Sequence, residues 1–255
     1  MPSMNPINKS RHSGSRFALG AISVLLAAVL TVGCALKSPM RVKIPGADEP
    51  VVGPFAADIQ NVRGAVELIV EGWLDRPVVE VLSIESGRPV DSSEHVAASV
   101  TRGEFGSILR VVSSDTARQA APAMMIRVRM PACDGARVRT AGGGVLALGV
   151  GGSIDIKVVQ ADHASGSIVV RTRRPISQPL SITTDSGDVS VTLGSASNLR
   201  VVARTAEGSA KLQANVARTS MNTQDLVHFD VDINDASAPG EVRTGRGDIR
   251  VVFRD

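Results

Sequence analysis

The position of Cys34 could give its thiol a covalent role. Cys34 directly follows the small residue Gly33, at the end of an apolar run from Phe17 to Val32. The residues before this run are basic, and no acidic residue occurs among the first 33. The basic residues are Lys9, Arg11 and Arg16. A basic start, a short apolar stretch and a small residue before the cleavage point are typical of a secretory signal peptide. We therefore expect residues 1–33 to be a signal peptide.

A cysteine at this point resembles the lipobox of bacterial lipoproteins. Val32 and Gly33 fit that pattern, whereas Thr31 stands where Leu is usual. The resemblance implies cleavage after Gly33 and a thioether-linked diacylglycerol on Cys34. It also implies a lipid-anchored protein of the bacterial cell envelope. In lipoprotein families an Asp after the cysteine often signals retention in the inner membrane. Ala35 stands there instead, which favours the outer membrane or the cell surface over the inner membrane.

Two other interpretations of this segment stay open. An ordinary secretory signal could be cut nearby, which would leave Cys34 without a role. The apolar run could also remain as an uncleaved membrane anchor, although its 16 residues fall short of the roughly 20 that span a bilayer. A buried core helix is disfavoured by the basic flank and by the position in the chain.

The charge balance changes once the expected signal peptide is set aside. Residues 1–33 hold three of the 28 Lys and Arg residues and none of the 25 Asp and Glu residues, so the remaining chain has 25 of each. The basic field of a nucleic-acid binder is therefore absent. The chain has no Tyr and one Trp, so aromatic platforms for bases or sugars are scarce. We expect no nucleic-acid partner and an aliphatic core.

Cys133 has no intrachain partner if Cys34 carries a lipid, so we expect no disulfide framework. A nucleophilic thiol would need a histidine near it, and none stands close in the sequence. We therefore expect Cys133 to be a small buried residue.

The remaining chain divides into a tether and a β domain. Residues 34–50 contain three prolines and little periodicity, which indicates a tether. From residue 51 to 255 the pattern is β, with irregular strands over 51–134. Ser92 to Ala98 is the one stretch that could be helical. The strand-like runs are Ala65–Val70, Val78–Val81, Ser107–Val112 and Met125–Met130.

A short repeat runs through residues 135–255. Each unit has a glycine, a small or polar residue and an aliphatic residue, and the gaps between the glycines are 9, 14, 21, 21 and 39 residues. The glycines are Gly143, Gly152, Gly166, Gly187, Gly208 and Gly247. The last gap is close to two periods, with Val227–Ile233 as a unit that lacks glycine. A period near 20 residues predicts a β-solenoid or β-helix-like stack of repeats.

The chemistry of one unit explains why it would repeat. Glycine can take a positive φ at a corner, and the Asp or Ser beside it can bond the turn backbone. In Asp188–Leu193 apolar residues then alternate with polar ones, so that one face enters a core. Only a neighbouring coil can cover that face, so the units must stack.

Three motifs resemble a known family. They are Asn61–Leu68, Ile126–Pro131, and the recurring Ser-Gly-Asp-Val and Gly-Ser-Ile units. Together they resemble the bacterial putative-adhesin family (DUF4097-like), over roughly residues 55–255. The resemblance implies a β-helix-like stack, often carried on secreted proteins and lipoproteins.

Several motifs suggest chemistry that the repeat explains better. Arg246-Gly247-Asp248 reads as an integrin-binding tripeptide, but Gly247 is already a repeat corner. Gly142–Ala147 has dinucleotide-binding glycines, but the residues that follow do not suit a helix. Turn acids in stacked coils could form a catalytic carboxylate pair, although solvated turn acids are the simpler interpretation. These acids are Asp155, Asp162, Asp185 and Asp188.

No cofactor or metal is expected. The histidines at 95, 163 and 228 have no zinc-binding spacing. Basic residues recur along the expected strands, and a basic stripe could bind an anionic glycan, a lipid headgroup or peptidoglycan carboxylates. The ordinary polar face of a half-buried strand is the favoured interpretation. The residues are Arg137, Arg139, Arg171, Arg173, Arg174, Arg200, Arg204, Arg243 and Arg250.

The sequence thus predicts a lipid-anchored extracytoplasmic binding or scaffold protein that is not an enzyme. Its expected partners are the membrane, through the lipid anchor, and envelope polysaccharide or another envelope protein. Two alternatives stay open: a carbohydrate-active β-helix enzyme, and a component of an envelope-stress sensor.

The anchor hypothesis predicts the behaviour of a Cys34→Ala variant. Without the thiol no diacylglycerol can be attached, so the precursor should stay uncleaved by the lipoprotein peptidase and take up no labelled fatty acid. Metabolic lipid labelling and membrane fractionation measure this. Unchanged processing and fractionation of the variant would refute the anchor.

Overall fold

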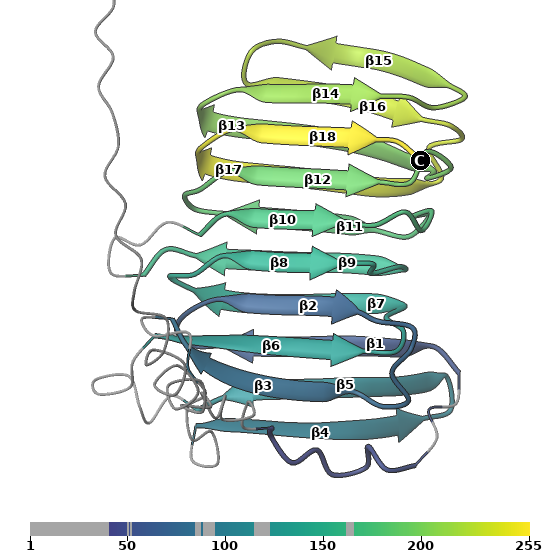
Figure 1. Ribbon diagram of the computed structural model, residues 1–255. Coiled ribbons are helices and arrows are strands. Elements are labelled where there is room, and N and C mark those ends of the chain that lie inside the picture. Colours follow the sequence, from purple (N-terminus) through teal and green to yellow (C-terminus); the bar gives the residue numbers. More distant parts are fainter. Residues whose placement is uncertain are drawn as a thin grey trace, which may run out of the picture. The chain divides into compact units, whose positions relative to one another are not determined.

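The structure is a computed structural model that describes residues 41–49, 51, 53–84, 88, 95–114, 123–161 and 166–255. These residues form an all-β fold with two sheets of mostly parallel strands (Figure 1). The described part contains no helix, and so none that could cross a membrane. Cys34 and the expected signal peptide lie outside the described residues.

The larger sheet has ten strands. In spatial order they are β15 (Thr219–Gln224), β16 (His228–Ile233), β13 (Leu199–Glu207), β17 (Ala238–Arg246), β11 (Leu180–Thr184), β9 (Ser153–Val159), β7 (Gly135–Ala141), β1 (Phe55–Asn61), β5 (Gly106–Ser113) and β4 (Val96–Gly103).

The second sheet has eight strands. They are, in order, β14 (Ala210–Ala214), β18 (Ile249–Phe253), β12 (Val189–Leu193), β10 (Ile168–Arg171), β8 (Val145–Leu148), β2 (Val66–Val70), β6 (Met124–Met130) and β3 (Val78–Ser83). Antiparallel pairs occur towards the ends of the sheets, at β3/β6, β4/β5, β13/β16 and β15/β16.

The core lies between the two sheets and is mainly aliphatic, as the composition predicts. Inward residues of paired strands stand in register, so that they form columns along each sheet. Ile156 of β9, for example, stands beside Val138 of β7 and Ile182 of β11, and all three are fully buried. Burying such columns removes apolar surface from water, at about 25 cal/mol per Å².

The repeats stack only partly in sequence order. β17 and β18 lie between β11–β12 and β13–β14 in their sheets. The unit predicted at Val227–Ile233 forms β16, which pairs antiparallel with β13 and β15 and has no partner strand in the smaller sheet. Residue spacing reveals that a unit lacks its glycine, but not the direction in which its strand runs.

The predicted helix at Ser92–Ala98 is wrong for its described part. Val96 begins β4, the last strand of the larger sheet, and pairs with Ser113 of β5. Val96 and Ala98 face the core while Ala97 is exposed. This two-residue alternation suits a strand with one buried face, and the antiparallel partner supplies the backbone hydrogen bonds. Residues 92–94 lie outside the described part of the chain.

Residues 41–49 cover the end of the fold formed by β3 and β4, and we call them the N-terminal cap. The Val42 amide donates to the Val79 carbonyl at 2.9 Å, and the Val100 amide donates to the Pro45 carbonyl at 3.0 Å. The cap thus satisfies backbone groups on the outermost strand of each sheet, which would otherwise be open edges. The tether stays a prediction for residues 34–40.

Glycines stack where the chain passes from the larger sheet to the smaller one, and we call them the glycine column. A Cβ added to Gly187 would lie 2.7 Å from the backbone of Gly166, and one added to Gly166 would lie 2.5 Å from the carbonyl oxygen of Gly143. The column consists of Gly64, Gly143, Gly166, Gly187, Gly247 and Gly208. Of the predicted corners, Gly152 lies outside it, because it precedes β9 in the larger sheet.

The glycine column predicts a large stability loss for Gly187→Ala. Gly187 has φ +126, and its added Cβ would overlap Gly166 backbone atoms at 2.7 Å. The strain and the overlap should cost about 2–4 kcal/mol of unfolding free energy, measured by denaturant titration. Gly72→Ala is the matched control, because nothing lies within 4 Å of its added Cβ. Equal losses in the two variants would contradict the role of the column.

Candidate binding site

The turns that lead back from the smaller sheet to the larger one collect at the edge opposite the glycine column, and we call this the open-turn edge (Figure 1). Hydrogen bonds join successive turns there. The Ile176 amide donates to the Ser197 hydroxyl at 3.0 Å, and the Asn234 side chain donates to the Ser197 carbonyl at 2.7 Å. The turn between β10 and β11 spans eight residues and carries several exposed side chains.

One hollow on this edge is lined by arginines, and we call it the arginine hollow. Its volume is about 650 Å³. Arg171 ends β10, and the buried Thr172 that follows accepts a hydrogen bond from the Arg174 amide at 3.1 Å. This local turn leaves the flanking arginines exposed. The lining residues are Gly149, Arg171, Thr172, Arg173, Arg174, Thr192, Arg254 and Asp255.

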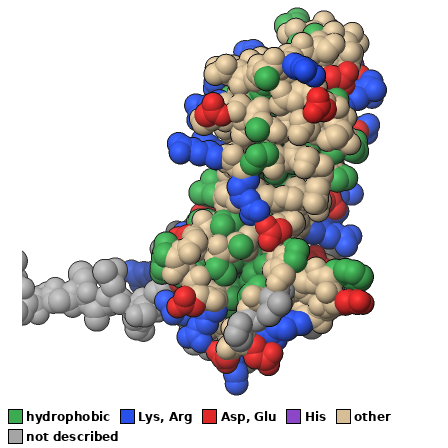
Figure 2. Space-filling view, turned by 90° about the vertical axis from the view of Figure 1, so that its right-hand side faces the viewer, with side chains coloured by type: hydrophobic (Ala, Val, Ile, Leu, Met, Phe, Trp, Pro, Cys, Tyr) green, Lys and Arg blue, Asp and Glu red, His purple; other side chains and the backbone are tan. Residues whose placement is uncertain are grey.

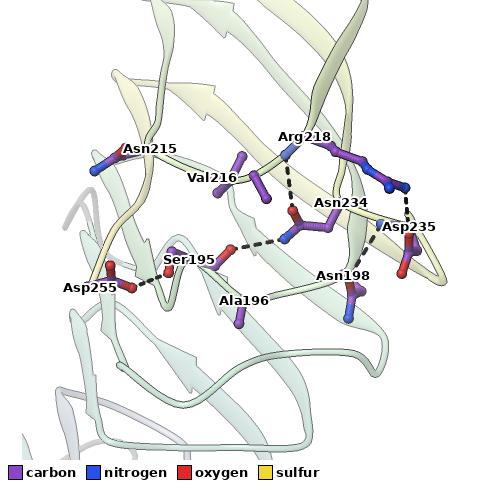
Figure 3. A pocket seen from close by; sticks show the side chains of 10 residues that line it. Ser195, Ala196, Asn198, Asn215, Val216, Arg218, Asn234, Asp235 and Asp255 are labelled. Carbon is purple, nitrogen blue, oxygen red and sulfur yellow. Dashed lines mark hydrogen bonds and ion pairs between the residues drawn. The ribbon is translucent and has the colours of Figure 1, made fainter.

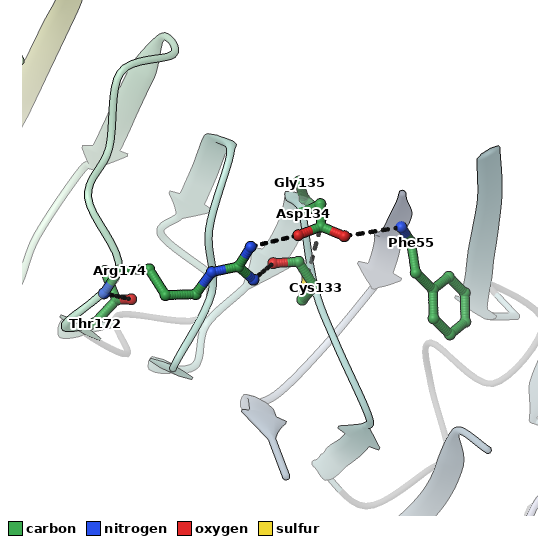
Figure 4. A network of polar contacts seen from close by, with 6 residues as sticks. All are labelled: Phe55, Cys133, Asp134, Gly135, Thr172 and Arg174. Carbon is green, nitrogen blue, oxygen red and sulfur yellow. Dashed lines mark hydrogen bonds and ion pairs between the residues drawn. The ribbon is translucent and has the colours of Figure 1, made fainter. Parts of the chain in front are cut away.

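Arg174 has protein partners, as Figure 4 shows. Its guanidinium donates to the Asp134 carboxylate at 2.5 Å and to the Cys133 carbonyl at 3.0 Å. The Arg174 guanidinium lowers the pKa of the Asp134 carboxyl, and a hydrogen bond from the Phe55 amide acts in the same direction. Arg174 therefore links the turn after β10 to the turn before β7.

The other three arginines of the hollow are not paired with acids. Within the described residues, no ion pair joins Arg171, Arg173 or Arg254 to a carboxylate. Like charges held near each other repel, and a bound anion would relieve that repulsion. A planar guanidinium can also bind a carboxylate or phosphate through two parallel hydrogen bonds.

A second hollow adjoins the first, and we call it the polar hollow (Figure 3). Its volume is about 630 Å³, and Asp255 lines both hollows. Asn234, whose φ is +52, connects two turns that line the hollow. Its side-chain amide donates to the carbonyls of Ser195 and Ser197. The lining residues are Ser195, Ala196, Asn198, Asn215, Val216, Ala217, Arg218, Asn234, Asp235 and Asp255.

The three charged side chains in the polar hollow already have partners. The Arg218 guanidinium lies 3.6 Å from the Asp235 carboxylate. The Ser195 hydroxyl donates to the Asp255 carboxylate. The remaining polar lining consists mainly of amide and hydroxyl groups, which are donors and acceptors suited to sugar hydroxyls.

The predicted basic residues do not form one continuous stripe. Arg171, Arg173 and Arg174 meet in the arginine hollow, whereas Arg204 and Arg250 lie on strands of different sheets. Four others pair with acids on the face of the larger sheet, as the ordinary polar-face interpretation predicts. These are Arg137 and Arg139 with Asp155, Arg200 with Asp230, and Arg243 with Glu241.

Sequence reasoning missed Arg254 and the asparagines of the polar hollow. Arg254 follows β18, whose last three residues are all buried, so no alternation in the strand marks Arg254 as exposed. The asparagines come from turns far apart in the sequence, and no local pattern brings them together.

Two of the candidate catalytic acids, Asp185 and Asp188, accept hydrogen bonds from backbone amides of neighbouring turns. Asp188 accepts a hydrogen bond from the Asp248 amide at 2.8 Å, and Asp248 accepts one from the Ser209 amide at 2.8 Å. Bonds from the Ser209 amide and hydroxyl lower the pKa of Asp248. Asp185 accepts a bond from the Gln160 amide at 3.0 Å. These turns include the Arg246-Gly247-Asp248 motif; Asp162 lies outside the described residues.

The structure does not support a dinucleotide site at Gly142–Ala147, and it brings no metal-binding cluster together among the described residues. Gly142–Ala147 leads into the strand β8, not into a helix. Among the described residues, no group of three or more His, Cys, Asp and Glu could hold a metal ion. His95 and His228 belong to this part of the chain, and His163 lies outside it.

Distant likenesses to this chain occur among solved structures. No protein-family model matches the sequence, and no curated protein matches it. A crystal structure of a "putative cell adhesion protein" from Clostridium sporogenes ATCC 15579 has 10% identity and a TM-score of 0.49, over 84% of this chain and 99% of that one. A "putative adhesin" from Bacteroides fragilis NCTC 9343 has 9% identity and a TM-score of 0.31, over 80% and 94%. Neither likeness is close enough to transfer a function.

The structure predicts that Cys133 is unreactive in the folded protein. The side chain is fully buried, its thiol donates to the Gly135 carbonyl at 3.2 Å, and burial raises its pKa to about 11. Because the thiolate is the nucleophile, alkylation at pH 8 should be slow until denaturant unfolds the chain. Mass spectrometry of maleimide labelling measures this. Rapid labelling of the folded protein would contradict the buried position and reopen a nucleophilic role.

Proposed function

We propose that the protein is a non-catalytic binding module of the bacterial envelope, anchored by a lipid on Cys34. Its ligand is an anionic polymer that also bears hydroxyl groups, such as an acidic envelope polysaccharide. The binding site is the open-turn edge, with the arginine hollow holding acidic groups and the polar hollow holding sugar hydroxyls. The coils between residues 51 and 255 act as a β-solenoid that presents this edge.

The observation that carries the proposal is the set of unpaired arginines in the arginine hollow. Arg171, Arg173 and Arg254 line one hollow without an acidic partner among the described residues. The chain after residue 33 has equal numbers of basic and acidic residues, so these charges are not part of a general basic surface. A hollow that gathers unpaired guanidinium groups in such a chain suits a ligand that brings negative charge.

The adjoining polar hollow extends this site along the edge. Figure 2 views this edge directly, with basic side chains exposed over its middle. Asp255 lies where the two hollows meet and would repel an acidic group there. A polymer with spaced acidic groups can place its charges beside the arginines and its neutral sugars beside the amides. A small multivalent anion would use only the arginine hollow.

The proposal predicts weaker polymer binding when the arginines lose their charge. Arg171→Gln and Arg173→Gln should each weaken binding of a polyuronate about 10-fold, because a hydrogen bond to a charged group contributes about 1.5 kcal/mol or more. The dependence of affinity on salt concentration should also become less steep, because fewer charge contacts remain. Isothermal titration calorimetry at two salt concentrations measures both effects.

Arg137→Gln is the matched control, because Arg137 lies on β7 beside Asp155 and outside both hollows. This variant should bind the polyuronate as the natural chain does. Equal affinity in all three variants would overturn the assignment of the site. Release of shorter sugars from the polymer during the titration would instead favour the carbohydrate-active enzyme.

A further inference from the structure

The two exposed aromatic side chains of the described part stand out in a chain that has few aromatics. The sequence holds one Trp and five Phe. Phe55, Phe229 and Phe253 are fully buried in the core, whereas Trp73 is 73% exposed and Phe105 is 87% exposed. A buried aromatic stabilises a fold, but an exposed one has apolar surface that water solvates poorly. Both exposed rings are therefore available to a partner outside the fold.

Both rings lie on the open-turn edge, at the end of the stack that the N-terminal cap covers. Trp73 is in the turn between β2 and β3, and Phe105 is in the turn between β4 and β5. Ion pairs join this region to the cap: Arg76 of the first turn lies 2.8 Å from Asp48, and Arg102, near the end of β4, lies 2.9 Å from Glu49. Figure 2, which views the open-turn edge, shows several hydrophobic side chains in its lower part.

The distance from Cys34 to the cap is limited by the covalent chain. Arg41, the first described residue, is seven residues after Cys34. A fully extended chain spans at most about 3.6 Å per residue, so these residues reach no more than roughly 25 Å. A lipid on Cys34 therefore keeps the capped end of the fold close to the bilayer surface.

We propose that Trp73 and Phe105 insert into the interfacial layer of the bilayer and hold the capped end of the fold against it. This rests on the proposed lipid anchor. Trp is enriched at the headgroup level of membranes, and a second attachment strengthens binding by a lipid anchor. Arg76 and Arg102 are paired with cap acids, so the contact depends on the rings and not on charge. Zwitterionic lipids should suffice, and salt should have little effect.

Trp73 is the only tryptophan, so its fluorescence reports on this contact directly. The lipidated full chain is placed in phosphatidylcholine vesicles, and co-flotation is measured together with the emission spectrum. We expect a blue shift and quenching by lipids brominated near the headgroup, unchanged at high salt. Phe105→Ser should reduce the quenching by at least half while co-flotation persists.

A second variant moves the probe to the opposite end of the fold. Leu226 is 81% exposed in the turn between β15 and β16. In a chain with Trp73→Phe and Leu226→Trp, the new tryptophan should keep the emission of a water-exposed ring and escape the brominated lipids. Equal quenching of both probes would overturn the end-on contact.

The remaining outcomes separate this inference from the proposed function. Co-flotation with an unshifted, unquenched Trp73 would overturn the inference and leave the anchor intact. Failure to co-float, with no change in emission, would overturn both. A blue shift caused by a soluble acidic polysaccharide without vesicles would assign Trp73 to the polymer and overturn the membrane contact.

Discussion

The close approach of backbones at the glycine column is the constraint on which the fold depends. Parallel strands in neighbouring coils lie about 4.8 Å apart, and the sharp corners bring the turn backbones into direct contact. Only glycine, which has no Cβ, allows the backbones to approach this closely. Buried threonines bond to the corner glycines at several levels: the Thr184 hydroxyl donates to the Gly166 carbonyl at 3.0 Å, and the Thr244 hydroxyl donates to the Gly187 carbonyl at 2.9 Å. These bonds satisfy carbonyls that the corner would otherwise bury without a partner.

This constraint assigns different tasks to the two edges of the fold. The glycine positions of the corners have no room for a side chain. At the open-turn edge, side chains join successive turns, as Asn234 does by donating to the carbonyls of Ser195 and Ser197. Loops on a rigid scaffold are where binding residues usually occur. The arginine hollow and the polar hollow both lie there, which is why the candidate site involves the turns and not the flat sheet faces.

Local patterns in the sequence predicted local features well. The all-β class, the aliphatic core, the buried Cys133 and the turn role of Asp188 follow from residue types and short spacings. The order of the strands does not. β17 pairs with both β11 and β13, and β1 pairs with both β5 and β7, so the pairings join segments that the repeat period would not bring together. The site was found only in part for the same reason: Arg171–Arg174 is one local run, whereas Arg254 arrives from the last strand.

The strand order also bears on which anion the arginine hollow would bind. From β3, which borders the cap, the smaller sheet passes β6, β2 and β8 before it reaches β10. Four steps of about 4.8 Å place β10 roughly 20 Å from the capped end. If the stack stands upright on the bilayer, with only its capped end in contact, this distance exceeds the Debye length of about 8 Å at physiological salt. Lipid headgroups would then lie beyond the reach of Arg171 and Arg173, so a polymer that extends away from the membrane is the better ligand for the hollow.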